Sequence, residues 1–474
     1  MFFYCIFLLG FVKLIYSTER IDFMKHSIAP DYMNSAEWIE YYQKLELEYK
    51  QSYEEGLDIE QYKDLFTAVS KMPNSKEKDD IADTLFSIIS KAETREGYEY
   101  NEPSEIDAIK ALRDGFTVKG EMPDTNTLKK KIEGAWIGRI CGCLLGKPVE
   151  GARQHDLIPL LKETGNYPMH RYILRNEITD EMIEKYDHYL GGVNYIDVLD
   201  CAPVDDDTNY TVMSQLIIEK HGRDFTSQNV GDMWLATQPI CNYFTAERIA
   251  FKNLVNGYSA PASAMYKNPY REWIGAQIRG DYFGYINPAD PATAADMAWR
   301  DARISHIKNG IYGEMWASSM IACAAVTDNV ADIIKGGLGQ IPETSRLYKE
   351  IYGVLADFEN GVGFDSVISE IHRQYDEYSD HGWCHTISNA KIVAAALLYG
   401  NGDFGQSICM AVQSGFDTDC NGATVGSVLG MAKGIDSVDS YWYTPLNGRL
   451  KTSILGHNEL LISELVNKTL EHIK

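Results

Sequence analysis

Two short acidic motifs hold the residues of this sequence that are best suited to chemistry. Residues 205–207 are three consecutive aspartates, and residues 417–419 read Asp-Thr-Asp. Each motif directly precedes a helical pattern, where free backbone N–H groups favour a carboxylate as a helix cap. An acidic solvated loop is the commoner structure, but neighbouring carboxylates repel one another unless a cation lies among them. Together the motifs predict one hydrolytic site built around hard divalent cations, magnesium or manganese.

Two other segments offer groups that could complete such a site. Pro148 ends a helical pattern, and Glu150 follows it in a loop. An isolated glutamate there belongs to solvent, whereas beside a pair of cations it is a candidate ligand or general base. A second segment, with Ser305, His306, Gly310 and Tyr312, interrupts a helical region and can contact a ligand. The simpler interpretation of a single histidine is a hydrogen-bonded structural residue.

Glycines spaced by four residues mark the two helices that must position these groups. They are Gly134, Gly138, Gly142 and Gly146 in one helix, and Gly426, Gly430 and Gly434 in the other. A glycine inside a helix costs about 1 kcal/mol relative to alanine, so the repeated pattern needs a compensating contact. A stripe without side chains lets another helix backbone approach closely. The pattern predicts tight helix packing, with the acidic motif and Glu150 at the helix ends.

The rest of the chain predicts an all-α protein. From residue 128 to 474 nearly every segment has helical periodicity, and no series of alternating strand patterns occurs. We expect this region to be the catalytic domain. Residues 21–127 are polar and helical in rhythm, with amphipathic patterns at 38–45 and 80–92 and a helix start at Ser104, and predict a helical appendage.

The composition excludes some functions and constrains the compartment. A net charge of −24 argues against direct nucleic-acid binding, and the apolar residues 1–20 are too short a run to span a membrane. The uncharged run within this segment is only Met1–Val12, because Lys13 interrupts it, and it has the length of a signal-peptide core without its positive leader. A false start with translation from Met24 is the alternative. The nine cysteines are odd in number and several lie in apolar helical patterns, which indicates reduced thiols. We expect a cytoplasmic protein, or a secreted one if residues 1–17 are a signal peptide.

These motifs, in this order, resemble those of the ADP-ribosylglycohydrolase family, which includes the dinitrogenase reductase-activating glycohydrolase. The matching segments are residues 134–151, 205–208, 278–281, 301–306 and 415–427. They extend over roughly two-thirds of the chain, from about residue 128 to 435. The resemblance implies an all-α orthogonal helical bundle with two magnesium or manganese ions in a central cleft.

The resemblance also assigns roles to residues. One cation would be held by Asp205, Asp206, Asp207 and Asp419, and the other by Asp417, Asp419 and Cys420, with Glu150 nearby. Glu150, Asp206 and Asp419 would be catalytic, and Ser305, His306, Gly310 and Tyr312 would contact the substrate.

Two residues depart from the family pattern. Asp205 stands where serine or threonine is common, so its extra charge is expected to tighten metal binding. Cys420 replaces a hydroxyl residue, and a thiol is a poor ligand for a hard cation.

The implied reaction is hydrolysis of the ribosyl glycosidic bond of an ADP-ribosylated protein or small ADP-ribosyl compound, with release of ADP-ribose. Such a bond breaks through an oxocarbenium-like transition state that carboxylates stabilise, and paired cations can hold ribose hydroxyls and activate water. The alternatives are a catalytically silent ADP-ribose-binding protein and a crystallin-like structural protein on the same fold. The sequence leaves the acceptor group open.

Overall fold

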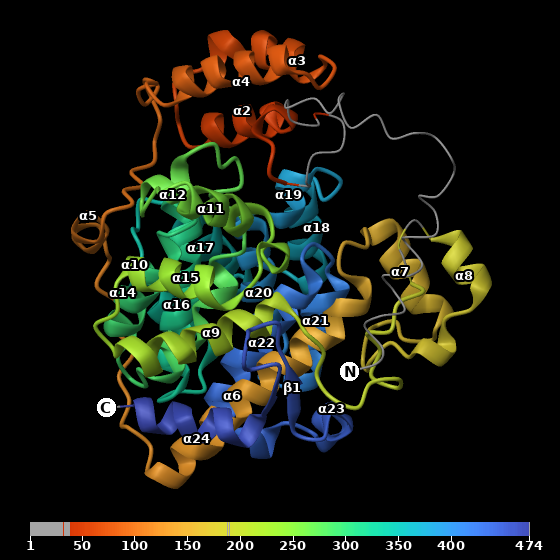
Figure 1. Cartoon of the computed structure of the whole chain (residues 1–474). Coiled ribbons are helices and arrows are strands. Elements are labelled where there is room, and N and C mark those ends of the chain that lie inside the picture. Colours follow the sequence, from red (N-terminus) through yellow and green to blue (C-terminus); the bar gives the residue numbers. More distant parts are fainter. Residues whose placement is uncertain (1–31, 33–37, 187, 189, 474) are drawn as a thin grey trace.

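The protein is almost entirely helical in a computed structural model that describes residues 32, 38–186, 188 and 190–473 (Figure 1). The predicted all-α fold class is confirmed. Within the described residues the only sheet is a short antiparallel hairpin, β1 (Arg449–Lys451) with β2 (Glu459–Leu461). The apolar segment 1–20 lies outside the described residues.

The helices follow one another along the chain, with the longest connection between Lys185 and Asp206. The first eleven are α2 (Leu45–Glu54), α3 (Lys63–Ser70), α4 (Lys76–Ile89), α5 (Ile106–Ala111), α6 (Thr125–Gly146), α7 (Gln154–Glu163), α8 (Asp180–Lys185), α9 (Asp206–His221), α10 (Ser227–Thr237), α11 (Thr245–Val255) and α12 (Ala262–Met265). The others are α13 (Asp281–Tyr285), α14 (Pro291–Ala302), α15 (Lys308–Ala324), α16 (Val330–Leu338), α17 (Arg346–Glu359), α18 (Phe364–Gln374), α19 (Asp380–Cys384), α20 (Thr386–Tyr399), α21 (Phe404–Gln413), α22 (Thr418–Lys433), α23 (Ser440–Tyr443) and α24 (Ile462–His472).

The glycine stripes of α6 and α22 face each other, as the four-residue spacing predicts. The two helices run antiparallel, with Gly138 against Gly426 and Gly142 against the additional glycine Gly422. A Cβ atom on Gly138 would lie 2.1 Å from the carbonyl oxygen of Gly426, so no side chain fits between the backbones. Gly434 has a different role from the one predicted. It ends α22 in a left-handed conformation, with φ +78°.

Helices that are buried on nearly all sides surround this pair. Almost every residue of α15 and α20 is buried, which explains why their apolar side chains are not confined to one face. Amphipathic helices such as α17, α18 and α24 cover them from outside. Helix α24 lies beside α6, and the indole N–H of Trp136 donates a hydrogen bond to the Thr469 hydroxyl at 3.0 Å.

The N-terminal helices α2, α3 and α4 form a small layer on one end of the body (Figure 1). Their apolar core includes Tyr42, Leu45, Phe66 and Leu85. The pattern at residues 38–45 does not form one helix. Trp38 has a left-handed backbone conformation, with φ 60°, Tyr41–Gln43 form a single 3-10 turn, and α2 begins only at Leu45. Ser104, predicted as a helix start, does not cap α5. Its hydroxyl instead accepts a hydrogen bond from the backbone N–H of Lys308 at the start of α15.

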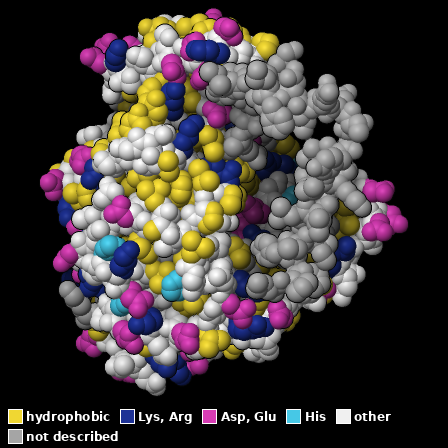
Figure 2. Space-filling model, in the orientation of Figure 1, with side chains coloured by type: hydrophobic (Ala, Val, Ile, Leu, Met, Phe, Trp, Pro, Cys, Tyr) yellow, Lys and Arg dark blue, Asp and Glu magenta, His cyan; other side chains and the backbone are white. Residues whose placement is uncertain are grey.

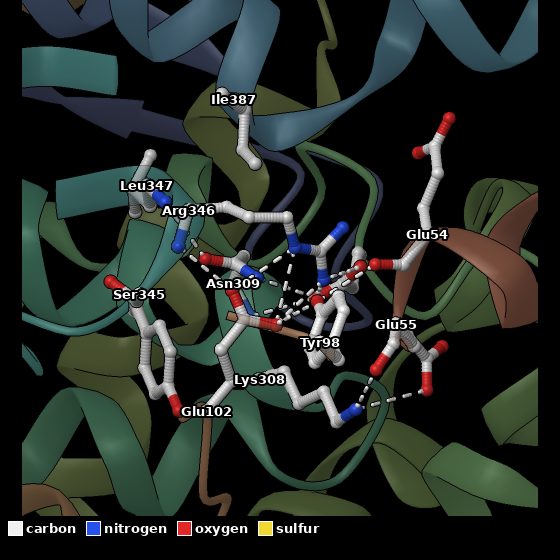
Figure 3. A network of polar contacts seen from close by, with 12 residues as sticks. Glu54, Glu55, Tyr98, Glu102, Lys308, Asn309, Ser345, Arg346, Leu347 and Ile387 are labelled. Carbon is white, nitrogen blue, oxygen red and sulfur yellow. Dashed lines mark hydrogen bonds and ion pairs between the residues drawn. The ribbon is translucent and has the colours of Figure 1, made fainter. Parts of the chain in front are cut away.

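A buried polar network joins this N-terminal layer to the body (Figure 3). The Arg346 guanidinium binds Glu102 at 2.8 Å and Glu272 at 2.9 Å. Glu272, which is completely buried, also accepts hydrogen bonds from the Gln51 side chain at 2.7 Å and from Asn309. Every carboxylate of this network therefore has a charged or polar partner, which is the condition for burying it.

Replacing Gly138 with alanine tests the helix contact. The added methyl group forces the two backbones apart, so the free energy of unfolding should fall by about 1–3 kcal/mol, as for overpacked cores. Gly353→Ala is the control, because Gly353 lies inside α17 and a Cβ atom added there would have no atom within 4 Å. It should stabilise the protein by about 1 kcal/mol. Denaturant unfolding of both variants measures the difference, and equal effects would contradict the packing argument.

Arg346→Met tests the network below the N-terminal layer. It leaves Glu102 and Glu272 buried without their guanidinium, so unfolding should become easier by about 3–5 kcal/mol. The control is Arg373→Met, because the pair of Arg373 with Glu370 is exposed and should contribute less than about 1 kcal/mol. A loss at position 346 no larger than at position 373 would show that the network does not hold the layer.

Candidate metal centre

The contact between α6 and α22 places the second acidic motif at the end of α6. The turn before α22 uses left-handed conformations at Gly415, with φ +79°, and Phe416, with φ 57°. The Thr418 hydroxyl then donates a hydrogen bond to the carbonyl oxygen of Gly146 at 2.9 Å. A Cβ atom on Gly146 would lie 2.4 Å from the backbone nitrogen of Asp419. The last glycine of the stripe is therefore required for the motif to reach α6.

Asp205 acts as a helix cap and as an ion-pair partner. One carboxylate oxygen accepts a hydrogen bond from the backbone N–H of Asp207 at 2.9 Å, which caps α9. The other binds the ammonium group of Lys147, just past the end of α6. The extra negative charge of Asp205 is therefore offset by Lys147, which modifies the expectation that it simply tightens metal binding.

Asp207 is held by a buried arginine. Arg139 of α6 donates to the Asp207 carboxylate at 2.8 Å and to its backbone carbonyl at 2.9 Å, and it also binds Asp281. All three side chains are buried. The second carboxylate oxygen of Asp207 is buried without a hydrogen-bond partner, so it is oriented and free to bind a cation.

Asp417 occupies a cap position without acting as a cap. It precedes α22, yet its side chain accepts no hydrogen bond from the first turn of that helix. Its Oδ2 accepts a hydrogen bond from the Cys384 thiol at 3.7 Å, and its Oδ1 is buried without a hydrogen-bond partner. The absence of a capping hydrogen bond removes the capping explanation for this aspartate.

The potential ligand atoms form two groups, each with all members within 4.8 Å of one another. The first contains Cys143, Asp205, Asp207 and Asp419, and the second contains Asp417, Asp419 and Cys420. Asp419 belongs to both. These residues fit divalent cations, which Asp419 and the free oxygens of Asp207 and Asp417 would hold.

Asp206 and Glu150 lie beside these groups without belonging to either. Asp206 is the first residue of α9 and is partly exposed, and Glu150 is exposed in the loop after α6. The charge of Asp419 raises the pKa of Glu150, and burial with the charges of Asp205 and Asp419 raises the pKa of Asp206. The same cluster of negative charges therefore disfavours the ionised forms of both residues, and a bound cation would reduce this repulsion.

Burial and mutual repulsion also raise the pKa values of the central carboxyl groups. For both Asp207 and Asp417 the main cause of the raised pKa is burial, and the charge of Asp419 adds to it. The charge of Arg139 lowers the pKa of Asp207 but does not outweigh burial. Burial and the charge of Asp205 likewise raise the pKa of Asp419. A cation that lies among these groups would favour their ionised forms.

Cys143 is the group member that the sequence interpretation missed. It lies on α6 one turn before Lys147 and two turns before Glu150, so the three residues share a side of the helix and its extension. The spacing of four residues from Cys143 to Lys147 and three from Lys147 to Glu150 is the sequence pattern that could have predicted its position in the site. Arg139 and Lys147 were missed for another reason, because their roles depend on which carboxylates the fold brings to them.

The four residues expected to contact the substrate are all buried. The Ser305 hydroxyl accepts a hydrogen bond from Arg279 at 3.0 Å and is paired with His306 Nδ1 at 2.8 Å. Burial, aided by the charge of Arg279, lowers the pKa of His306 well below its ordinary value. Tyr312 donates to the carbonyl oxygen of Pro103, and Gly310 packs against the backbone of Arg271. These contacts support the simpler, structural interpretation of this segment.

On the face shown in Figure 2, Lys and Arg side chains are interspersed with Asp and Glu among the described residues. In the part of the chain that the structure describes, no helix is long and apolar enough to cross a membrane.

The ADP-ribosylglycohydrolase family model matches residues 124–472. The chain therefore belongs to the ADP-ribosylglycohydrolase family, which confirms the resemblance of its motifs. One solved structure, described as an ADP-ribosylglycohydrolase-related protein complex, is 16% identical, with a TM-score of 0.39 over 73% of this chain and 98% of that chain. No curated protein matches the chain in sequence.

Replacing Lys147 with methionine tests whether its charge opposes cation binding. The ammonium lies among the same carboxylates, so its loss should lower the Kd for Mn²⁺ at least about fivefold. This follows from a Coulomb interaction of roughly 1–4 kcal/mol at such distances. Calorimetric titration measures it, with Lys130→Met as control, because Lys130 pairs with the exposed Asp436. The double variant K147M/D205S should return toward the original Kd, and an unchanged Kd in K147M would contradict the argument.

Proposed function

We propose that this protein hydrolyses the ribosyl glycosidic bond of an ADP-ribosylated protein or small ADP-ribosyl compound and releases ADP-ribose, with two divalent cations at the candidate metal centre. The observation that supports this most is the position of Asp419 in both ligand groups, flanked by the free buried oxygens of Asp207 and Asp417. Family membership supports the reaction class.

Different side chains of the centre would bind the cations and transfer protons. Asp207, Asp417 and Asp419 are fixed by buried contacts and would hold the cations, which supply Lewis-acid binding of ribose hydroxyls and activation of water. Glu150 lies exposed beside them. Its carboxyl group is suited to move a proton to or from the reacting oxygen atoms, as acid and base catalysis at a glycosidic bond requires.

Positive charge at the centre orients these carboxylates. Arg139 fixes one oxygen of Asp207 so that the other is directed into the group, and Lys147 compensates the cap residue Asp205. Because the guanidinium is buried and bound on both sides, Asp207 needs little reorganisation when a cation binds. Preorganisation of this kind is a main source of electrostatic catalysis.

Asp417→Asn tests the proposed function. The amide keeps the shape of the side chain but loses the charge, so release of ADP-ribose should fall at least about 100-fold, at or beyond the range seen when partners of metal ligands are lost. The assay uses a panel of ADP-ribosylated arginine, serine and small-molecule substrates, with magnesium, manganese or chelator. Asp436→Asn is the control, because that carboxylate pairs with Lys130 on the surface.

The outcomes separate the alternatives. Metal-dependent release by the original chain and by D436N, lost in D417N, supports the hydrolase. Binding of ADP-ribose without release by any chain would favour a catalytically silent binder, and neither binding nor release would favour a structural protein on this fold.

A further inference from the structure

Three buried thiols lie among the carboxylates of the metal centre. Cys143 belongs to the group with Asp205, Asp207 and Asp419, and Cys420 belongs to the group with Asp417 and Asp419. The third thiol, Cys384, donates a hydrogen bond to Asp417 and belongs to neither group. Each group of potential ligand atoms thus contains one sulfur.

We infer that Cys143 and Cys420 are metal ligands, one for each of the two cations, and that the centre prefers borderline or soft cations such as zinc, cobalt or cadmium. This inference rests on the proposed metal centre and specifies its ligands and its metal class. Thiolate sulfur favours such cations, whereas oxygen ligands alone suit magnesium and manganese. The thiol of Cys420 is then a ligand suited to its metal rather than a defect of the second site.

The surroundings of these two thiols differ from those of the other buried cysteines. Cys323 and Cys409 are also buried, but neither belongs to a group of potential ligand atoms. The sulfur of Cys143 instead faces three carboxylates, and that of Cys420 faces two, each group with a buried oxygen that lacks a hydrogen-bond partner. Burying carboxylate oxygens and sulfur atoms together is electrostatically costly, and cations bound among them would offset that cost.

The binding step balances without any redox partner. Each thiol releases its proton to solvent, and its sulfur forms a bond to the incoming cation. Both carboxylates of the second group remain charged ligands, so one divalent cation, two carboxylates and one thiolate carry a net charge of about −1, whereas in the first group Lys147 pairs with Asp205. No disulfide or oxidised sulfur forms.

A separate histidine cluster is less suited to a cation. The ligand-type atoms of Glu54, His381 and His385 also lie within 4.8 Å of one another. However, Nδ1 of His381 accepts a hydrogen bond from the Trp273 indole, and Nδ1 of His385 accepts one from the backbone N–H of Ile387. The proton of each neutral ring is then on Nε2, which in His381 donates to Glu54 at 2.8 Å, whereas in His385 it is buried 3.8 Å from Glu272 without a hydrogen-bond partner. Both ring nitrogens of His381 are therefore occupied, which leaves fewer free ligand atoms here than in either group of the metal centre.

The test titrates the metal-free full chain with Cd²⁺ and with Co²⁺ and records thiolate-to-metal charge-transfer absorption. We expect the absorption to fall by about half in Cys143→Ser and in Cys420→Ser, and to vanish in the double variant. The Kd for Cd²⁺ should rise at least about tenfold in each, since even outer partners of metal ligands change affinity by roughly 10–100-fold. The Kd for Mg²⁺ should change much less. Cys409→Ser and His381→Gln should match the original chain.

X-ray absorption of the zinc-loaded original chain gives a second readout that requires no variant. A sulfur shell at about 2.3 Å is expected. Persistence of the charge-transfer band in the double variant, or a zinc shell of oxygen and nitrogen alone, would overturn the inference. If Mg²⁺ or Mn²⁺ binds while no sulfur ligation appears, the sulfur inference fails and the proposed centre stands. If none of the cations binds, the centre itself is refuted.

Discussion

The direct contact between the backbones of α6 and α22 is the constraint on which the site depends. Gly138 and Gly142 face Gly426 and Gly422 so closely that a single methyl group would not fit between them. At the end of this contact the Thr418 hydroxyl binds the carbonyl oxygen of Gly146. The helices thus act as one rigid unit that carries ligands from two distant parts of the chain. The unfavourable helix propensity of the glycines is offset by this close packing.

Concentrating carboxylates at one point requires compensating charge, and the fold provides part of it. Arg139 and Lys147 are both carried by α6 or the residues directly after it, and each binds one aspartate of the first acidic motif. The second motif has no such cation in its ligand group, which consists of Asp417, Asp419 and Cys420. Bound divalent cations would balance the remaining negative charge. Repulsion between the carboxylates also contributes to the raised pKa values of Asp417 and Asp419.

Sequence patterns predicted the helical fold and the glycine contact because both follow from periodicity along one helix. The acidic motifs were found for a similar reason, since consecutive charges are visible without a structure. The role of Gly434 as a helix end and the structural contacts of Ser305, His306 and Tyr312 were not predictable in that way. The contacts depend on the N-terminal segment and on Arg279, which lie far away in sequence. Cys143 was detectable only by asking which residues share a helical side with Lys147 and Glu150.

The most direct test of the central claim is anomalous diffraction from crystals of the protein grown with Mn²⁺. We expect two peaks about 3.5–4 Å apart, both within bonding distance of Asp419, one beside Asp207 and the other beside Asp417. A single peak that Asp419 does not contact, or peaks only at the histidine cluster of α19 and α20, would contradict the claim that the packing of α6 on α22 assembles a dinuclear centre.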